Sequence, residues 1–138
     1  MSRNALLIVG AILGILRGVL GAFSGIGGLS TVSMIESIIP GYTPVFVFEF
    51  VLSFVVLGVA IFVLVKSNDP GSAGAIRGWG FAIIAAGVID LVWTLALVGA
   101  APEGIAAGLG SLGALALIGG LFVGGANRLR KASPPHPA

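Results

Sequence analysis

Four long apolar stretches, separated by short polar segments, account for most of this chain. They cover residues 5–23, 45–65, 78–99 and 105–126. A helix needs about 20 mostly apolar residues to cross the hydrocarbon core of a bilayer, and each stretch has that length. Their apolar residues are continuous and do not alternate with polar ones, which argues against the strands of a membrane β-barrel. The pattern predicts an all-α integral membrane protein in which residues 1–131 form a bundle of four transmembrane helices.

The polar segments predict two smaller features. In the first connection, over residues 30–39, Val32 and Ile35 fall on one face of a helix and Glu36 falls on another, and a Pro-Gly pair follows. An amphipathic helix of this kind is typical of a segment lying in the membrane interface, and a re-entrant lid over a cavity is the alternative. At the other end of the chain, the Pro-rich residues 132–138 predict a disordered cytoplasmic tail.

The distribution of basic residues predicts the orientation. Six of the seven Lys and Arg residues lie on one side of the four stretches: Arg3, Lys66, Arg77, Arg128, Arg130 and Lys131. The two connections on the other side contain neither residue type. Because cytoplasmic segments carry an excess of Lys and Arg, both termini are predicted to be cytoplasmic. The bias toward Gly, Ala, Val and Leu is typical of a high-GC bacterial genome, so we expect a multi-pass protein of the bacterial plasma (inner) membrane.

The N-terminus allows a second interpretation, a cleaved signal peptide. Residues 1–3 would be its basic region, residues 5–16 its apolar core, and residues 22–24 a small-residue cleavage site. Arg17 lies between this core and this site, where neutral residues are expected. Cleavage would leave three spans and place the new N-terminus outside, so we favour an uncleaved first span.

The composition excludes many classes of function. The chain of 138 residues is 57% hydrophobic and only 9% charged, whereas about a quarter of residues are charged in soluble domains. It has no Cys, which excludes disulfides, thiolate metal sites and cysteine nucleophiles. No phosphate loop, dinucleotide fingerprint, serine elbow or zinc signature is present, and the scattered basic residues do not form a nucleic-acid patch. We therefore expect a non-enzymatic protein without a cofactor or metal.

Three ionisable residues lie inside the predicted spans: Arg17, Glu49 and Asp90. Each costs about 2.5–3.5 kcal/mol at the centre of a membrane helix, so such residues normally face the bundle interior or water. Arg17 and Asp90 are both predicted about 18 Å from the cytoplasmic ends of their spans, with Glu49 about 6 Å from the outer end of its own. One hypothesis is a structural Arg17–Asp90 ion pair. The other is an ion or proton site, because one Arg faces two carboxylates and leaves one unneutralised.

Glycines at four-residue spacing predict close helix contacts. They are Gly10, Gly14 and Gly18 in the first stretch and Gly120 and Gly124 in the fourth. Without a hydrophobic driving force in lipid, helices associate through small residues that allow their backbones to approach. The sequence therefore predicts that both stretches pack through these positions.

The functional expectation has three forms. The leading one is an accessory or assembly subunit of a larger membrane-protein complex, because so short a chain with one charge cluster has little capacity for chemistry. The alternative is a small oligomeric ion- or proton-coupled channel or transporter that uses the intramembrane carboxylates. A phage-type membrane-permeabilising protein is a third form, suggested by size alone. The expected partners are the lipid bilayer and other copies of the chain or a larger complex.

Overall fold

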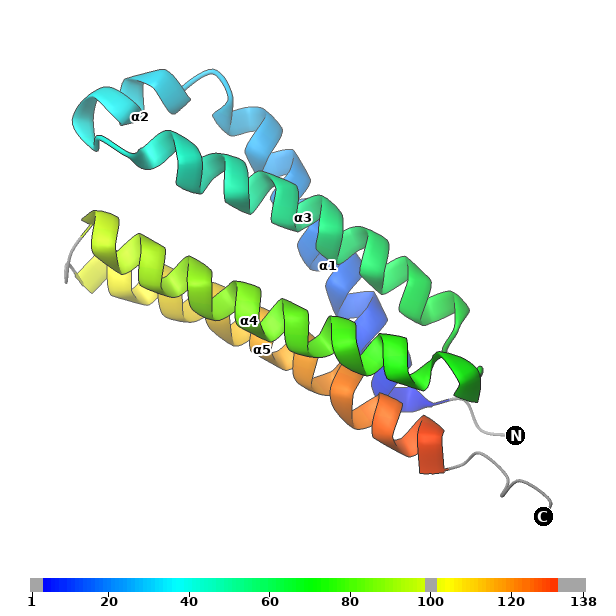
Figure 1. Ribbon diagram of the computed structural model, residues 1–138. Helices are drawn as coiled ribbons and strands as arrows, with labels where there is room; N and C mark the ends of the chain where they lie inside the picture. The colour runs from blue at the N-terminus through cyan, green and yellow to red at the C-terminus, as the bar shows by residue number, and fades with distance from the viewer. Residues whose placement is uncertain (1–3, 99–101, 132–138) are drawn as a thin grey trace, which may run out of the picture.

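The computed structural model describes residues 4–98 and 102–131, and this part of the chain is all-helical (Figure 1). The elements are α1 (Ala5–Gly28), α2 (Val32–Ile38), α3 (Tyr42–Val65), the short 3-10 helix η1 (Pro70–Ser72), α4 (Ala73–Val98) and α5 (Pro102–Lys131). The helices α1, α3, α4 and α5 are long and apolar enough to span a membrane. The predicted fold is therefore confirmed, whereas the predicted tail at residues 132–138 lies outside the described residues.

All four spanning helices are longer than the apolar pattern predicts, and the changes in α1 and α4 matter most for the site. The helix α1 continues five residues beyond its predicted end to Gly28, because Gly25 and Gly28 of this extension pack on α3. A Cβ at Gly25 would lie 2.7 Å from Phe50, and one at Gly28 would lie 2.9 Å from Phe46. This packing outweighs the low intrinsic helix propensity of Gly. The helix α4 begins at Ala73, five residues before its predicted start.

The turn between α2 and α3 is fixed by Glu36. Its carboxylate accepts hydrogen bonds from the backbone N–H groups of Gly41 at 2.9 Å and Thr43 at 2.7 Å, and from the Thr43 hydroxyl at 3.0 Å. These hydrogen bonds lower the pKa of Glu36 below its ordinary value. Gly41 has a φ of +93°, a left-handed conformation that Gly adopts without strain. The short helix predicted in the first connection is thus present, and its acidic residue caps the next span.

The four long helices form two hairpins. The helix α1 packs mainly on α3, and α4 packs mainly on α5. The start of α1, the end of α3, η1 and the end of α5 all lie at one end of the bundle, here called the η1 end, and α2 lies at the opposite or α2 end (Figure 1). The four long helices therefore run alternately between the two ends of the bundle, so that α1 begins and α5 ends at the η1 end.

The helix α1 packs on α5 in the half of the bundle near the η1 end, whereas toward the α2 end the hairpins meet through α3 and α4, where the ring centroids of Phe48 and Trp93 lie 5.8 Å apart. In the half near the η1 end, Asn4 Nδ2 donates a hydrogen bond of 2.6 Å to the backbone oxygen of Gly125, and Phe122 is fully buried in the core. Gly14 is the last glycine of α1 with α5 side chains among its nearest neighbours. At the later glycines of α1, the residues of another helix that lie nearest to an added Cβ all belong to α3. The helix α1 thus leaves α5 and follows α3 toward the α2 end, and this divergence creates the site described next.

Candidate functional site

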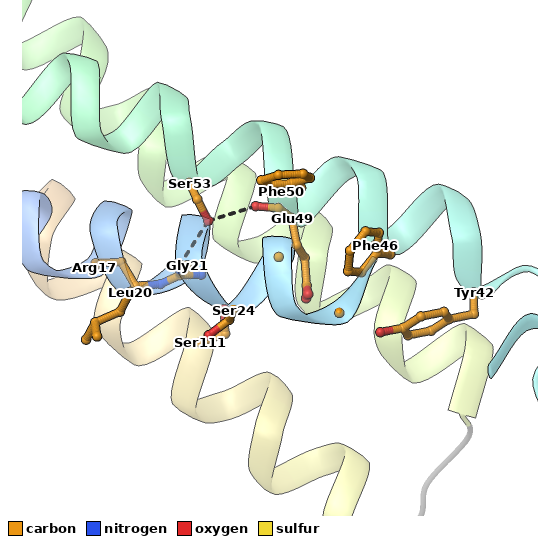
Figure 2. Close-up of a pocket in the computed structure, with 12 residues that line it drawn as sticks. Arg17, Leu20, Gly21, Ser24, Tyr42, Phe46, Glu49, Phe50, Ser53 and Ser111 are labelled. Carbon is orange, nitrogen blue, oxygen red and sulfur yellow. Dashed lines mark hydrogen bonds between the residues drawn. The ribbon is translucent and has the colours of Figure 1, made fainter. Parts of the chain in front are cut away.

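A cavity of about 420 Å³ lies where α1 and α3 diverge from α5 (Figure 2). Half of its lining residues are apolar or glycine, including Leu20, Phe46 and Phe50. Its polar lining residues come from three helices and are Arg17, Ser24, Tyr42, Glu49, Ser53 and Ser111. The cavity therefore gathers two of the three predicted intramembrane charges with four hydroxyl groups, at a depth where polar groups are costly.

Arg17 is held against α3 through Ser53. Its Nη1 donates a hydrogen bond of 3.5 Å to the Ser53 hydroxyl, which in turn donates one of 3.0 Å to the backbone oxygen of Glu49. Gly21, one turn beyond Arg17, makes this approach possible. A Cβ there would collide with Ser53 Oγ and would lie 2.6 Å from Arg17 Nη1. Figure 2 shows the Arg17 and Ser53 side chains meeting over Gly21. The absence of a side chain at Gly21 is thus a local requirement of the site.

Glu49 and Asp90 bring two carboxyl groups together from different hairpins. The Glu49 carboxyl on α3 is a close neighbour of the Asp90 carboxyl on α4 and also lies near enough to Arg17 for an electrostatic interaction. Asp90 is only 2% exposed. Its Oδ2 accepts a hydrogen bond of 3.4 Å from the Ser111 hydroxyl, whereas its Oδ1 is buried and has no hydrogen-bond partner among the described residues. A buried carboxylate oxygen without a partner is costly, so this pair has an unfilled capacity to bind.

The predicted Arg17–Asp90 ion pair is wrong, because Arg17 bonds to Ser53 and neither Asp90 oxygen bonds to Arg17. The reason is the length of α4. Asp90 lies seventeen residues from the start of α4, or about 26 Å, whereas Arg17 lies twelve residues from the start of α1, or about 18 Å. Glu49, sixteen residues from the end of α3, lies about 24 Å from the η1 end. Asp90 is therefore level with Glu49, and Arg17 is about one turn closer to the η1 end.

The glycines predicted in α1 lie at close contacts. The nearest atom to a Cβ would be 3.0 Å away at Gly10, 2.8 Å away at Gly14 and 2.7 Å away at Gly18. These atoms belong to α5 for Gly10 and to α3 for the other two. The helix thus changes its closest partner along its length, as the divergence of the hairpins requires.

The two glycines predicted in α5 need a correction. A Cβ at Gly120 would have nothing within 4 Å, and one at Gly124 would make only an ordinary contact at 3.5 Å. The close contacts of this helix are at neighbouring positions instead. A Cβ at Gly119 would lie 2.5 Å from the backbone oxygen of Gly80, and one at Gly125 would collide with an α1 side chain. A shift of one residue rotates a position by about 100° around a helix, so the predicted spacing identified an adjacent face.

The hydroxyl groups were not predicted from the sequence as residues of the site, although two of them carry a signal. Ser53 follows Glu49 by four residues, which places both on the same helix face. Ser111 is the only hydroxyl-bearing residue in the fourth apolar stretch. The hydroxyl of Tyr42 points into the cavity in Figure 2, and no local pattern distinguishes this position from that of an interfacial tyrosine.

Comparison with known protein families, curated proteins and solved structures finds no match to this chain.

Proposed function

We propose that this four-span protein is a small, non-enzymatic, ion- or proton-coupled channel or transporter whose site is the cavity lined by Arg17 and Glu49 together with the neighbouring Asp90. The observation that carries the proposal is the Glu49–Asp90 carboxyl pair, placed at the divergence of two hairpins beside a polar cavity. Within the part of the chain that the structure describes, Asp90 Oδ1 is buried there without a hydrogen-bond partner. Ionisable groups with a purely structural role in a membrane normally pair with each other or with backbone carbonyls, whereas this carboxylate oxygen is unpaired.

The charges of the site suggest what it binds. Two carboxylates and one guanidinium leave a net charge of about −1 in a medium where an isolated charge costs about 2.5–3.5 kcal/mol. One proton or one monovalent cation restores neutrality, whereas a divalent cation would leave an excess positive charge. Like charges in contact favour protonation of one of them. A proton shared between the two carboxyl groups would also give the free Asp90 oxygen a hydrogen-bond partner.

The charge distribution supports an orientation for this site. We propose that the η1 end faces the cytoplasm of a bacterial cell and that the protein is in its plasma membrane. Lys66, Arg77, Arg128, Arg130 and Lys131 all belong to the η1 end of the described bundle, as the positive-inside rule requires. In this orientation the cavity lies on the external side of the close contact between α1 and α5.

Flux through reconstituted protein tests the proposal. The full chain in liposomes should dissipate a proton, Na⁺ or K⁺ gradient faster than protein-free liposomes, as followed with pH- and cation-sensitive dyes. Glu49→Gln and Asp90→Asn should each abolish the flux. Asp69→Asn is the matched control, because the Asp69 carboxylate lies outside the cavity and bonds within its own turn to Gly71 and Ser72. Unchanged flux in Glu49→Gln, or no flux of any of the three ions in the wild type, would contradict the proposal.

We propose as a second function that the chain is an accessory or assembly subunit, and one observation favours it. Gly110, Gly113 and Gly120 share one face of α5, and a Cβ at any of them would have nothing within 4 Å. Such a face permits close approach of another membrane helix, from a second copy or from a larger complex.

This second proposal has its own test. A stoichiometric partner or homo-oligomer should copurify in mild detergent, and Gly113→Leu should disrupt that assembly. Gly58→Leu serves as the control, because Gly58 is equally open but lies on α3. Assembly that survives Gly113→Leu, or that is lost equally in both variants, argues against the α5 face.

A further inference from the structure

A second pocket, of about 300 Å³, lies at the η1 end, away from the carboxyl pair. It is formed between the start of α4 and the last turns of α5. The buried residues Ala73 and Ala126 line it, together with the side chains of Arg77, Asn127 and Arg130. Two guanidinium groups from different helices thus share one concave site.

The charge of this pocket is uncompensated within the described residues. No acidic residue lines it, and neither Arg77 nor Arg130 has a described acidic group within 4.0 Å. The nearest acidic residue in sequence, Asp69, is engaged in its own turn, where it accepts hydrogen bonds from Gly71 N and Ser72 Oγ at 3.0 and 2.9 Å. Each guanidinium offers five N–H donors in a planar fork that matches phosphate geometry. The pocket is therefore built for a phosphate-bearing anion.

The position of the pocket indicates that the anion belongs to a lipid headgroup. Arg77 and Arg130 lie near the ends of helices that are long and apolar enough to span a membrane, where lipid headgroups are expected. Arg77 also lies over the ring of Phe81, 5.5 Å from its centroid, and Phe81 is 50% exposed on the membrane-spanning surface of α4. A headgroup in the pocket would thus have an apolar helix surface beneath it for its acyl chains. Basic pockets between membrane helices bind anionic headgroups in this way.

We propose that the pocket between α4 and α5 binds the headgroup phosphate of an anionic phospholipid through Arg77 and Arg130. The site is independent of the carboxyl cavity and of the function proposed for it. The proposal does not depend on which leaflet the η1 end faces.

Native mass spectrometry of the full chain in detergent tests this site. The protein is titrated with phosphatidylglycerol and with phosphatidylcholine of the same acyl chains. Phosphatidylglycerol should bind more tightly, and the double variant Arg77→Gln/Arg130→Gln should weaken its binding about tenfold or more. The double variant Arg128→Gln/Lys131→Gln is the matched control. It removes the same charge at the same end from exposed residues that do not line the pocket, and it should leave binding unchanged.

Three outcomes would overturn the proposal. An equal loss in both double variants would indicate attraction by net charge, and equal affinity for the two lipids would exclude recognition of an anionic headgroup. Thermal stabilisation by excess inorganic phosphate but not by phosphatidylglycerol would identify a free-anion site instead. If the Arg77→Gln/Arg130→Gln protein does not fold by circular dichroism, the single variants are compared with Arg128→Gln under the same criteria.

Discussion

Replacing Gly18 with Ala is expected to destabilise the α1–α3 hairpin, whereas the same replacement at Gly58 should be tolerated. A Cβ at Gly18 would lie 2.7 Å from the Cβ of Leu57 and 2.9 Å from both its Cα and its backbone nitrogen. A Cβ at Gly58, the next residue of α3, would have nothing within 4 Å. The two substitutions therefore add the same methyl group to a spanning helix in opposite environments.

The magnitude follows from these distances. Carbon atoms pack best at about 3.5–4.0 Å, so the new contact at Gly18 would be too short by about 1 Å. Because the neighbours of Gly18 are the Cβ and backbone of Leu57, no rotamer change relieves the clash, and the helices must separate. Overpacking of this kind costs about 1–3 kcal/mol. Ala gains about 1 kcal/mol over Gly in helix propensity, but both variants share this gain. The difference between them isolates the steric cost.

The assay is reversible unfolding of the purified protein in mixed detergent micelles, followed by circular dichroism. The free energy of unfolding should be lower for Gly18→Ala than for Gly58→Ala by about 1–3 kcal/mol. Gly14→Ala should fall between them, since its Cβ would have a single neighbour closer than 3 Å, the Ala60 Cβ at 2.8 Å. Equal stability of the Gly18 and Gly58 variants would refute the close α1–α3 contact.

Further predictions concern the orientation, the α2–α3 turn and the carboxyl pair. Reporter fusions after Asn68 and after Ala138 should both report the cytoplasm, and an external signal at either position would contradict the orientation. Because hydrogen bonds lower the pKa of Glu36, its carboxylate stabilises the turn at neutral pH, and this contribution is lost as the pH falls through the folded-state pKa. Amide hydrogen exchange in the turn should therefore be faster in Glu36→Gln than in the wild type at neutral pH and converge with it in acid; equal exchange at neutral pH would exclude the cap. A double-mutant cycle of Glu49→Gln and Asp90→Asn should give a coupling energy of about 0.5–3 kcal/mol, and simple additivity would show that the two carboxyl groups do not interact.

The number and type of the spanning helices could be predicted from the sequence because the length of an apolar stretch is a strong constraint in a bilayer. Their ends could not. The extension of α1 to Gly28 depends on Phe46 and Phe50 of another helix, and the earlier start of α4 follows the η1 turn, in which Asp69 caps Gly71. Such contacts are tertiary or involve polar residues, and hydropathy does not report them.

An error of five residues at a helix end changed the predicted chemistry. Starting α4 at its observed residue moves Asp90 by about 7 Å along the bundle, from the level of Arg17 to the level of Glu49. The same three ionisable residues were identified from their cost in the membrane, but their pairing depended on an axial position that the apolar pattern does not fix. The glycines show the corresponding uncertainty in rotation about the helix axis. The contact face of α1 was predicted correctly, whereas the contact face of α5 lies one residue away from the predicted positions.

The proposed function links the carboxyl pair to the separation of the hairpins. Glu49 belongs to the α1–α3 hairpin and Asp90 to the α4–α5 hairpin, and near these residues α1 has no close glycine contact with α5. A proton or monovalent cation held between the carboxyl groups would therefore connect α3 and α4 of the two hairpins, next to the contact between Phe48 and Trp93. Its release would leave two like charges in a low-dielectric environment, where their repulsion is far stronger than in water. Occupancy of the site would then control how far the hairpins diverge. The distance between spin labels on α2 and on the outer part of α4 should therefore differ between the wild type at high pH and Glu49→Gln, which mimics the neutral state. An unchanged distance would show that the site acts without moving the hairpins.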